Sequence, residues 1–172
     1  MEKKFEIAPF SHRLGAYFID FLIVLLFWYV VTIKDLDKVD KLLETINLEQ
    51  QESLEIFIEG IFKLYVSFIL KWLFIQTVYH TLLPSIIGRG KTLGKLLFGI
   101  SMVDRSNLKE ISPSRLILRE FIARGLIETI LIIPFFISMV LVCIKETRAI
   151  HDYISKTIVI KDSAVGEEDE YA

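Results

Sequence analysis

Arg13 and Asp20 are the two residues whose types and spacing point most directly to chemistry. They stand seven positions apart at the start of a long apolar run. On an α-helix this spacing is almost two turns, so both side chains lie on one face, about 10 Å apart along the axis. An ionised carboxylate in hydrocarbon costs at least about 2.5–3.5 kcal/mol unless it is paired. The pair therefore indicates either an ion or proton site, with Asp20 as the ion carrier and Arg13 as its tuning charge, or a polar contact that locks the helix in a bundle.

Three more ionisable residues lie in apolar surroundings and are candidates to support such a site. Lys71 lies deep in a second apolar run, where we consider Asp20 and Glu128 as its partners. His80 lies near the end of the same run and could titrate near neutral pH, although a lone histidine at an interface is more often structural. Glu128 itself lies within a third apolar run.

The other reactive residue types do not form the motif of an enzyme. Cys143 is the only cysteine and lies in an apolar run, and the three histidines are scattered, so the spacing of a metal site is missing. The stretch Gly90-Lys-Thr-Leu-Gly-Lys95 does not fit a phosphate-binding loop, because Leu96 follows where that loop needs Ser or Thr. We interpret it as a turn or helix at the cytoplasmic interface, with its lysines near lipid phosphates. We expect no enzymatic activity, cofactor, metal or nucleic-acid partner.

The elements that position these residues are predicted to be membrane-spanning helices. Of the 172 residues 53% are hydrophobic, while a normal 24% are charged, so the two kinds are segregated along the chain. A hydrocarbon core of about 30 Å needs about 20 residues of helix. Apolar runs of this length lie at 14–33, 60–83 and 125–144. The first is too long for a signal peptide and lacks a cleavage site, and we expect Pro84 to end the second.

Charge alternates between the segments that connect these runs. Residues 34–59 contain three lysines against eight acidic residues, whereas residues 84–124 contain eight basic residues against three acidic ones. Basic residues near span ends mark the cytoplasmic side. The N-terminus and the 84–124 loop are therefore predicted to face the cytoplasm, and the acidic 34–59 loop to face outward. Apolar residues at helical spacing in that acidic loop predict an amphipathic helix within it.

The third apolar run conflicts with this topology if it crosses the membrane once. The segment that follows, 145–161, has four basic residues against two acidic ones and should stay in the cytoplasm. Pro134 removes a helical hydrogen bond near the middle of the run and bends or breaks the helix there. We therefore prefer a re-entrant or tightly paired segment over a single straight span. Residues 162–172 carry five acids and no base, which predicts a mobile tail after a membrane domain of residues 1–161.

Two short segments look extended rather than helical. Residues 99–104 and 156–160 are rich in β-branched and apolar residues, which is typical of strands. We expect them to pair into a small cytoplasmic two-stranded ribbon. The predicted fold is thus an all-α membrane protein, a small bundle with two clear transmembrane helices, a third Pro-broken segment and this ribbon.

Four blocks of the chain resemble the RDD family of small bacterial membrane proteins, which is named for one arginine and two aspartates. The blocks are Arg13-Leu-Gly-Ala-Tyr-Phe-Ile-Asp20, then Gly90-Lys-Thr-Leu-Gly-Lys95 leading to Gly99-Ile-Ser-Met-Val-Asp104, then Ser112 to Arg119, and finally His151-Asp152 followed by Thr157-Ile-Val-Ile160. By this resemblance, which covers about residues 10–161, the name-giving trio is Arg13, Asp20 and Asp152. The chain departs from the family at Lys91, where glutamine is frequent, and in its acidic 34–59 loop.

The resemblance implies a multi-pass protein of the bacterial inner membrane, with cation or proton exchange suggested for some members. We expect transport of a monovalent cation or proton through Asp20, in a homo-oligomer, because so small a bundle encloses little volume. The alternative is a non-transporting membrane scaffold or accessory module that recruits a partner through its basic cytoplasmic face. Because a straight helix keeps Arg13 away from Asp20, we consider Asp152 as the partner of Arg13. We expect Arg13→Ala and Asp152→Ala to lower stability by similar amounts.

Overall fold

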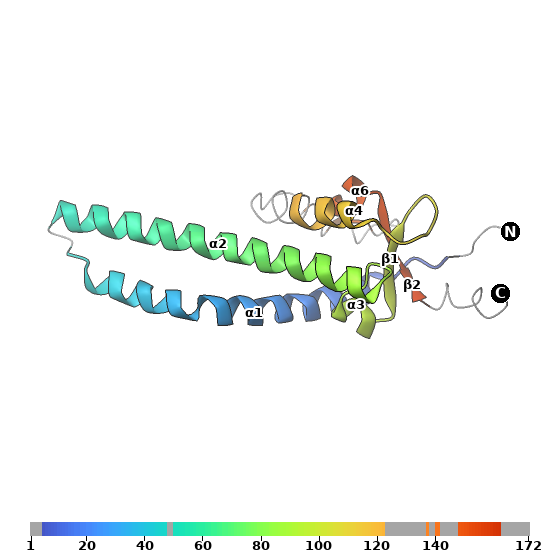
Figure 1. Ribbon diagram of the computed structural model, residues 1–172, viewed down its shortest axis with the longest axis horizontal. Coiled ribbons are helices and arrows are strands. Elements are labelled where there is room, and N and C mark those ends of the chain that lie inside the picture. The colour runs from blue at the N-terminus through green and yellow to red at the C-terminus, as the bar shows by residue number, and fades with distance from the viewer. Residues whose placement is uncertain (1–4, 48–49, 123–136, 138–139, 142–147, 163–172) are drawn as a thin grey trace. The chain divides into compact units, whose positions relative to one another are not determined.

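The computed structural model of this chain describes residues 5–47, 50–122, 137, 140–141 and 148–162. The described part is mostly helical and contains a two-stranded antiparallel sheet (Figure 1). The structure thus confirms two parts of the predicted fold class, the mostly helical fold and the small two-stranded sheet. The chain forms two compact units, of which one is Ile23–Ile75 and the other combines the residues before and after it.

Two long helices contribute to both units. Helix α1 spans Phe10–Glu44 and helix α2 spans Gln51–Ile87, so each contains one predicted apolar span and extends beyond it. The expected amphipathic helix of the acidic loop is not a separate element, because α1 simply continues through residues 34–44. That stretch contains neither glycine nor proline, so its backbone gives the helix no reason to stop. The membrane side on which it lies stays a prediction.

Pro84 does not end the second apolar helix, and the expectation that it would is wrong. Pro84 lies inside α2, which continues to Ile87. Proline cannot donate a helical hydrogen bond, but its carbonyl oxygen can accept one, and here it accepts from the Gly88 amide at 3.0 Å. The helix stops at Gly88, whose φ of 84° is the left-handed conformation that commonly follows a helix end.

One helix of the described residues, α1, is long and apolar enough to cross a membrane. Its length and composition agree with the first predicted span. The crossing by the second predicted span stays a prediction. The third predicted run, 125–144, lies outside the described residues except for positions 137, 140 and 141.

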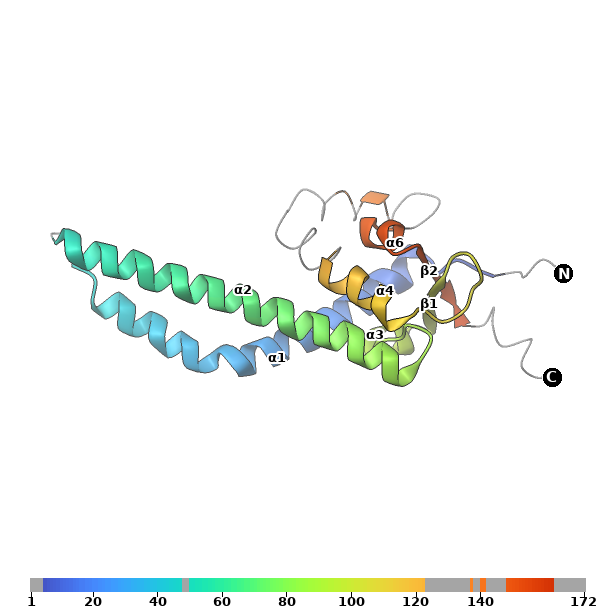
Figure 2. The same cartoon turned by 45° about the horizontal axis from the view of Figure 1, so that its top comes forward.

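Within Ile23–Ile75 the two helices lie side by side (Figures 1 and 2). Trp28 is central to this contact, because its ring meets Phe68 and Trp72 edge-on at centroid distances of 5.7 and 6.2 Å. Its indole N–H also donates to the Phe68 carbonyl oxygen at 3.1 Å. Farther along, Gly60 approaches Leu42 so closely that an added Cβ would lie 2.7 Å from the leucine side chain. Aromatic packing and a small residue thus hold the helix pair together.

The other unit contains the predicted ribbon, which the structure confirms. Strand β1 (Ile100–Asp104) pairs antiparallel with β2 (Thr157–Lys161), with Met102 opposite Val159. Ile7 forms a further bridge to Ile160, so the residues just before α1 extend the ribbon on its β2 side. The N-terminal segment and the ribbon are therefore one hydrogen-bonded assembly.

Among the described residues, three short helices lie near this ribbon in the same unit. They are α3 (Leu93–Leu97), α4 (Pro113–Ile117) and α6 (Ile150–Ile154). The core between ribbon and helices is apolar and consists of Ala8, Ala16, Ile100, Met102, Ile111, Leu116 and Val159. Both β1 and the start of α1 contribute to it, and this places Arg13 and Asp20 beside the ribbon and its helices.

Candidate functional site

Arg13 and Asp152 form a direct ion pair. Arg13, in the first turn of α1, donates from Nη2 to Oδ2 of Asp152 in α6 at 2.6 Å, and the two side chains are 9% and 0% exposed. This is the contact that the sequence analysis considered for Arg13. It connects residues 139 positions apart in the chain, so it ties the start of the first helix to the segment that precedes β2.

Asp152 is also bound by a second arginine, Arg119, which the sequence analysis did not propose as a site residue. Arg119 donates from Nε at 3.2 Å and from Nη2 at 2.8 Å to Oδ1 of Asp152. Its remaining nitrogen pairs with Glu120. The charges of two arginines and two carboxylates balance among Arg13, Arg119, Glu120 and Asp152, and this pairing offsets the cost of burying the ions. His151 lies 3.7 Å from Asp152 and adds a positive charge to this network when it is protonated.

Local backbone structure explains how these side chains reach one another. Residues 118–122 continue α4 as a π-helical turn, a wider geometry that is often found at functional sites. Asp152 is in the first turn of α6, where it accepts a hydrogen bond from the Ala149 amide at 3.2 Å. A carboxylate at this position also interacts favourably with the helix dipole.

The electrostatics of the network stabilise the charged forms. Burial by itself raises the pKa of Asp152, but the positive charges of Arg119, His151 and Arg13 outweigh it and hold that pKa well below the ordinary value. Burial likewise works against the Arg119 cation, yet the charges of Glu120 and Asp152 raise the pKa of its guanidinium. Asp152 is therefore an anion at neutral pH and Arg119 a cation.

Asp20 lies apart from this network, in a site of neutral donors. It is 2% exposed and accepts hydrogen bonds from the Tyr79 hydroxyl at 2.7 Å, from the Thr92 hydroxyl at 2.5 Å and from the Gly94 amide at 2.8 Å. Thr92 caps the N-terminus of α3 and Gly94 is in its first turn. Asp20 thus fixes the turn that begins at Gly90 against the first helix.

Close packing at Gly94 makes the Asp20 site tight. A Cβ added at Gly94 would lie 2.2 Å from the carbonyl oxygen of Ala16 and 2.9 Å from Cγ of Asp20. Only glycine allows this approach of the turn to the helix. The same turn contains Lys95, which the sequence analysis expected near lipid phosphates. That expectation is wrong for Lys95, since it is 7% exposed and its ammonium donates to the Gly90 carbonyl oxygen at 3.0 Å.

The structure therefore divides the trio of Arg13, Asp20 and Asp152 into two sites. The hypothesis that Arg13 tunes Asp20 is not what the contacts show, because Arg13 pairs with Asp152 and Asp20 is held by uncharged groups. The family block around Thr92 and Gly94 was the signal that could have identified the partners of Asp20. A buried carboxylate needs donors, and that block supplies a hydroxyl and free helix-terminal amides.

The three supporting residues fall in different places. Lys71 belongs to Ile23–Ile75, where it pairs with Asp35 rather than with Asp20, which was one of the two partners considered for it. Asp35 is 4% exposed, and its Oδ1 also accepts a hydrogen bond from the Lys38 ammonium at 2.5 Å. His80 is 6% exposed and meets the Tyr79 ring edge-on at 5.0 Å, which puts it next to the Asp20 site. Glu128 lies outside the described residues.

Comparison with known proteins agrees with the motif blocks. The model of the RDD family matches residues 7–156, a range that contains both carboxylate sites and strand β1 and that ends just before β2. No curated protein and no solved structure matches the chain. Because the family match covers most of its length, this chain belongs to the RDD family.

Proposed function

We propose that this protein is a membrane-embedded module that is not an enzyme, does not itself transport ions, and recruits a partner through a basic surface. The observation that carries the proposal is the closed, fully hydrogen-bonded environment of Asp20. The proposal favours the scaffold or accessory hypothesis over cation or proton exchange.

The apolar surface of Ile23–Ile75 supports a position in the lipid bilayer. Large apolar side chains of both helices are more than half exposed in this unit, among them Leu26, Val30, Phe62 and Phe74. Exposed apolar surface on this scale is typical of contact with lipid or with another protein. Together with the length of α1 and the family, it favours lipid as the neighbour.

The Asp20 site supports a structural role for its carboxylate. A carboxylate that carries an ion or a proton must bind and release it, so at least one carboxylate oxygen has to be accessible from outside the site. Both Asp20 oxygens instead accept hydrogen bonds from the protein, and Gly94 packs against the carboxyl group too closely for even a methyl group. A buried acceptor with matched donors stabilises a fold and gives it a unique geometry.

Charge supports recruitment of an anionic partner. Residues 84–124 have eight basic and three acidic side chains. Of the basic ones, Lys95 and Arg119 are buried, whereas Arg105 and Lys109 are exposed. The excess of basic residues favours a cytoplasmic position for this surface. A partner that binds there should therefore present negative charge.

Reconstitution into liposomes with pH-sensitive and cation-sensitive dyes tests the proposal. Wild-type protein and the Asp20→Asn variant should both leave imposed proton, Na⁺ and K⁺ gradients as stable as protein-free liposomes do. Asp37→Asn, at an exposed acid of the same helix, is the matched control. A wild-type flux that is lost in Asp20→Asn but kept in Asp37→Asn would establish transport and overturn the proposal.

A further inference from the structure

Helix α3 exposes its leucines and buries its lysine. Of its five residues, Leu93, Leu96 and Leu97 are 39%, 49% and 72% exposed, whereas Gly94 and Lys95 are buried. The Lys95 ammonium is hydrogen-bonded within the protein. A helix on a protein surface that faces water has the reverse arrangement, with charged residues outward and leucines inward. The arrangement of α3 therefore suits apolar surroundings.

The buried side of α3 is fixed against the start of α1. The Gly94 amide donates to Asp20 at 2.8 Å, and a Cβ added at Gly94 would lie 2.2 Å from the Ala16 carbonyl oxygen. Just after α3, the Phe98 ring is so close to Gly15 that a Cβ added there would lie 2.2 Å from it. Because these contacts set the orientation of α3, its leucines cannot turn inward without breaking them.

The part of α1 that lies beside α3 is the beginning of its apolar run. Among the described residues, α1 is the helix that is long and apolar enough to cross a membrane, and its apolar run begins at Leu14. Leu14, Tyr17 and Phe18 are all exposed. Tyrosine is enriched where a membrane meets water, because its ring is amphipathic. The leucines of α3 thus emerge at the same level as the first exposed apolar residues of the candidate span.

The position of α3 along α1 matches the depth of a helix that lies in a membrane surface. Gly94 contacts Ala16 and Asp20, which follow Leu14 by two and six residues. At 1.5 Å per residue, α3 therefore lies about 3–9 Å along the helix from the start of the apolar run. Interfacial helices bury their apolar face about 5–10 Å into the boundary between headgroups and acyl chains. This agreement favours lipid over a protein as the neighbour of the leucines.

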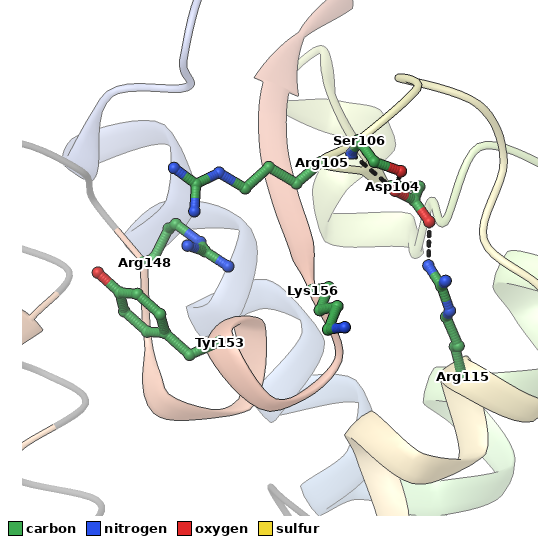
Figure 3. A pocket seen from close by; sticks show the side chains of 7 residues that line it. All are labelled: Asp104, Arg105, Ser106, Arg115, Arg148, Tyr153 and Lys156. Carbon is green, nitrogen blue, oxygen red and sulfur yellow. Dashed lines mark hydrogen bonds and ion pairs between the residues drawn. The ribbon is translucent and has the colours of Figure 1, made fainter.

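Strand β1 leads away from α3 to a polar turn. It begins at Ile100, shortly after α3, and ends at Asp104. Asp104 pairs with Arg115 and accepts hydrogen bonds from the amide and hydroxyl of Ser106 at 2.7 and 2.5 Å (Figure 3). The strand is about 13 Å long at about 3.3 Å per residue. The polar turn is thus separated from the leucines of α3, and its side chains suit contact with water.

We propose that α3 is an interfacial anchor, which inserts its three leucines among the acyl chains of the leaflet that α1 enters near Leu14. The hydrogen bond from Gly94 to Asp20 fastens the anchor to α1 and fixes the depth of the start of that helix in the bilayer. The Asp20 site then lies at the level of the membrane boundary. The inference rests on the proposed function, because it specifies how the membrane-embedded module contacts lipid.

Nitroxide labels on the full chain in phosphatidylcholine liposomes test the anchor. Leu97→Cys carries the label in a Cys143→Ala background, since Cys143 is the only cysteine. Lys109→Cys, at an exposed residue of the segment after β1, is the control for water, and Leu26→Cys, in the candidate span and 63% exposed, is the reference for lipid. Electron paramagnetic resonance then measures how often each label collides with molecular oxygen, which concentrates among acyl chains, and with a water-soluble nickel chelate.

The label at Leu97 should collide more with oxygen than with the nickel chelate, as the label at Leu26 does. The label at Lys109 should show the reverse order. The depth that follows from the two collision rates at Leu97 should be about 5–10 Å below the headgroups. Leu93→Cys places a label on the same face of α3, and it should give the same order of collision rates as Leu97→Cys.

Two results would overturn the inference. A label at Leu97 that meets the nickel chelate as often as the label at Lys109 does would place α3 in water. A label at Leu97 that is shielded from both reagents would mean that protein covers the leucines, for example a second copy of the chain. In either case a lipid-exposed label at Leu26 leaves the membrane position of the proposed function intact. A label at Leu26 in water would overturn that position together with the anchor.

Discussion

Asp20 and Asp152 are both buried carboxylates, and the protein satisfies them by different physical means. Asp20 accepts hydrogen bonds from two hydroxyl groups and one backbone amide, whereas Asp152 faces two arginines. Neutral donors hold a carboxylate through directed hydrogen bonds, without a second buried charge. Paired charges add a penalty for disruption, because removal of one partner leaves the other ion buried. Two aspartates that look equivalent in the family pattern therefore anchor different elements, α3 in one case and α6 in the other.

The largest effect should follow from loss of the Asp152 carboxylate. Asp152→Ala leaves Arg13 and Arg119 without their shared anion, and the removal of one member from a buried charge network costs about 3–5 kcal/mol. Denaturant unfolding in detergent micelles, followed by far-UV circular dichroism, measures this change. Glu59→Gln is the control, since Glu59 pairs with Lys63 on the surface with both side chains more than 60% exposed, and it should change little. Equal effects of the two variants would contradict a buried network.

A smaller effect is expected from crowding at the Asp20 site. Gly94→Ala forces a Cβ against the carbonyl oxygen of Ala16 and against Asp20, and overpacking of this kind costs about 1–3 kcal/mol. Gly99→Ala is the comparison variant, because Gly99, unlike Gly94, has a positive φ of 59°, so alanine there meets backbone strain alone while its Cβ meets no atom within 4 Å. Thermal unfolding should show the larger loss for Gly94→Ala. If Gly99→Ala were the more damaging change, the packing around Asp20 would be looser than the structure indicates.

The pH dependence of stability should separate the two sites further. The pKa of Asp152 is well below its ordinary value in the folded protein, so the unfolded chain binds a proton more readily. Its contribution to stability is therefore complete above the unfolded pKa of about 3.9 and is lost as the pH falls through the folded pKa. Unfolding free energies measured between about pH 3 and pH 6 should fall less steeply with acid in Asp152→Asn than in the wild type. An unchanged slope would show that Asp152 is not held as an anion by its arginines.

The sequence predicts the helices and strands better than it predicts the tertiary contacts between them. The apolar run from residue 14 predicts the first helix by its length alone, and the β-branched residues in 99–104 and 156–160 predict the ribbon. Both signals are local, because they depend on composition over a few consecutive residues. The end of a helix is less local, because α2 runs past Pro84 to Ile87 although the proline nitrogen cannot donate a helical hydrogen bond to the preceding turn.

The partners of the two carboxylates could be predicted only in part. Arg13 and Asp152 were connected through the family pattern and the length of a helix. Arg119 could not be connected to Asp152 in this way, because it is one of eight basic residues in its segment. Its inward position depends on a π-helical turn, which the residue types in that stretch do not predict. The link between Asp20 and Thr92 spans 72 positions, and such a contact depends on the tertiary fold rather than on any period in the sequence.

A double-mutant cycle on Arg13 and Asp152 tests most directly that a buried ion pair locks α1 to α6. Because Arg119 still holds Asp152 when Arg13 is removed, Arg13→Ala should cost less than Asp152→Ala, about 1.5–3 kcal/mol, which revises the expectation of similar effects. The double variant should cost less than the sum of the two by about 1–3 kcal/mol, as for residues in direct contact. Additivity within about 0.5 kcal/mol would contradict the lock.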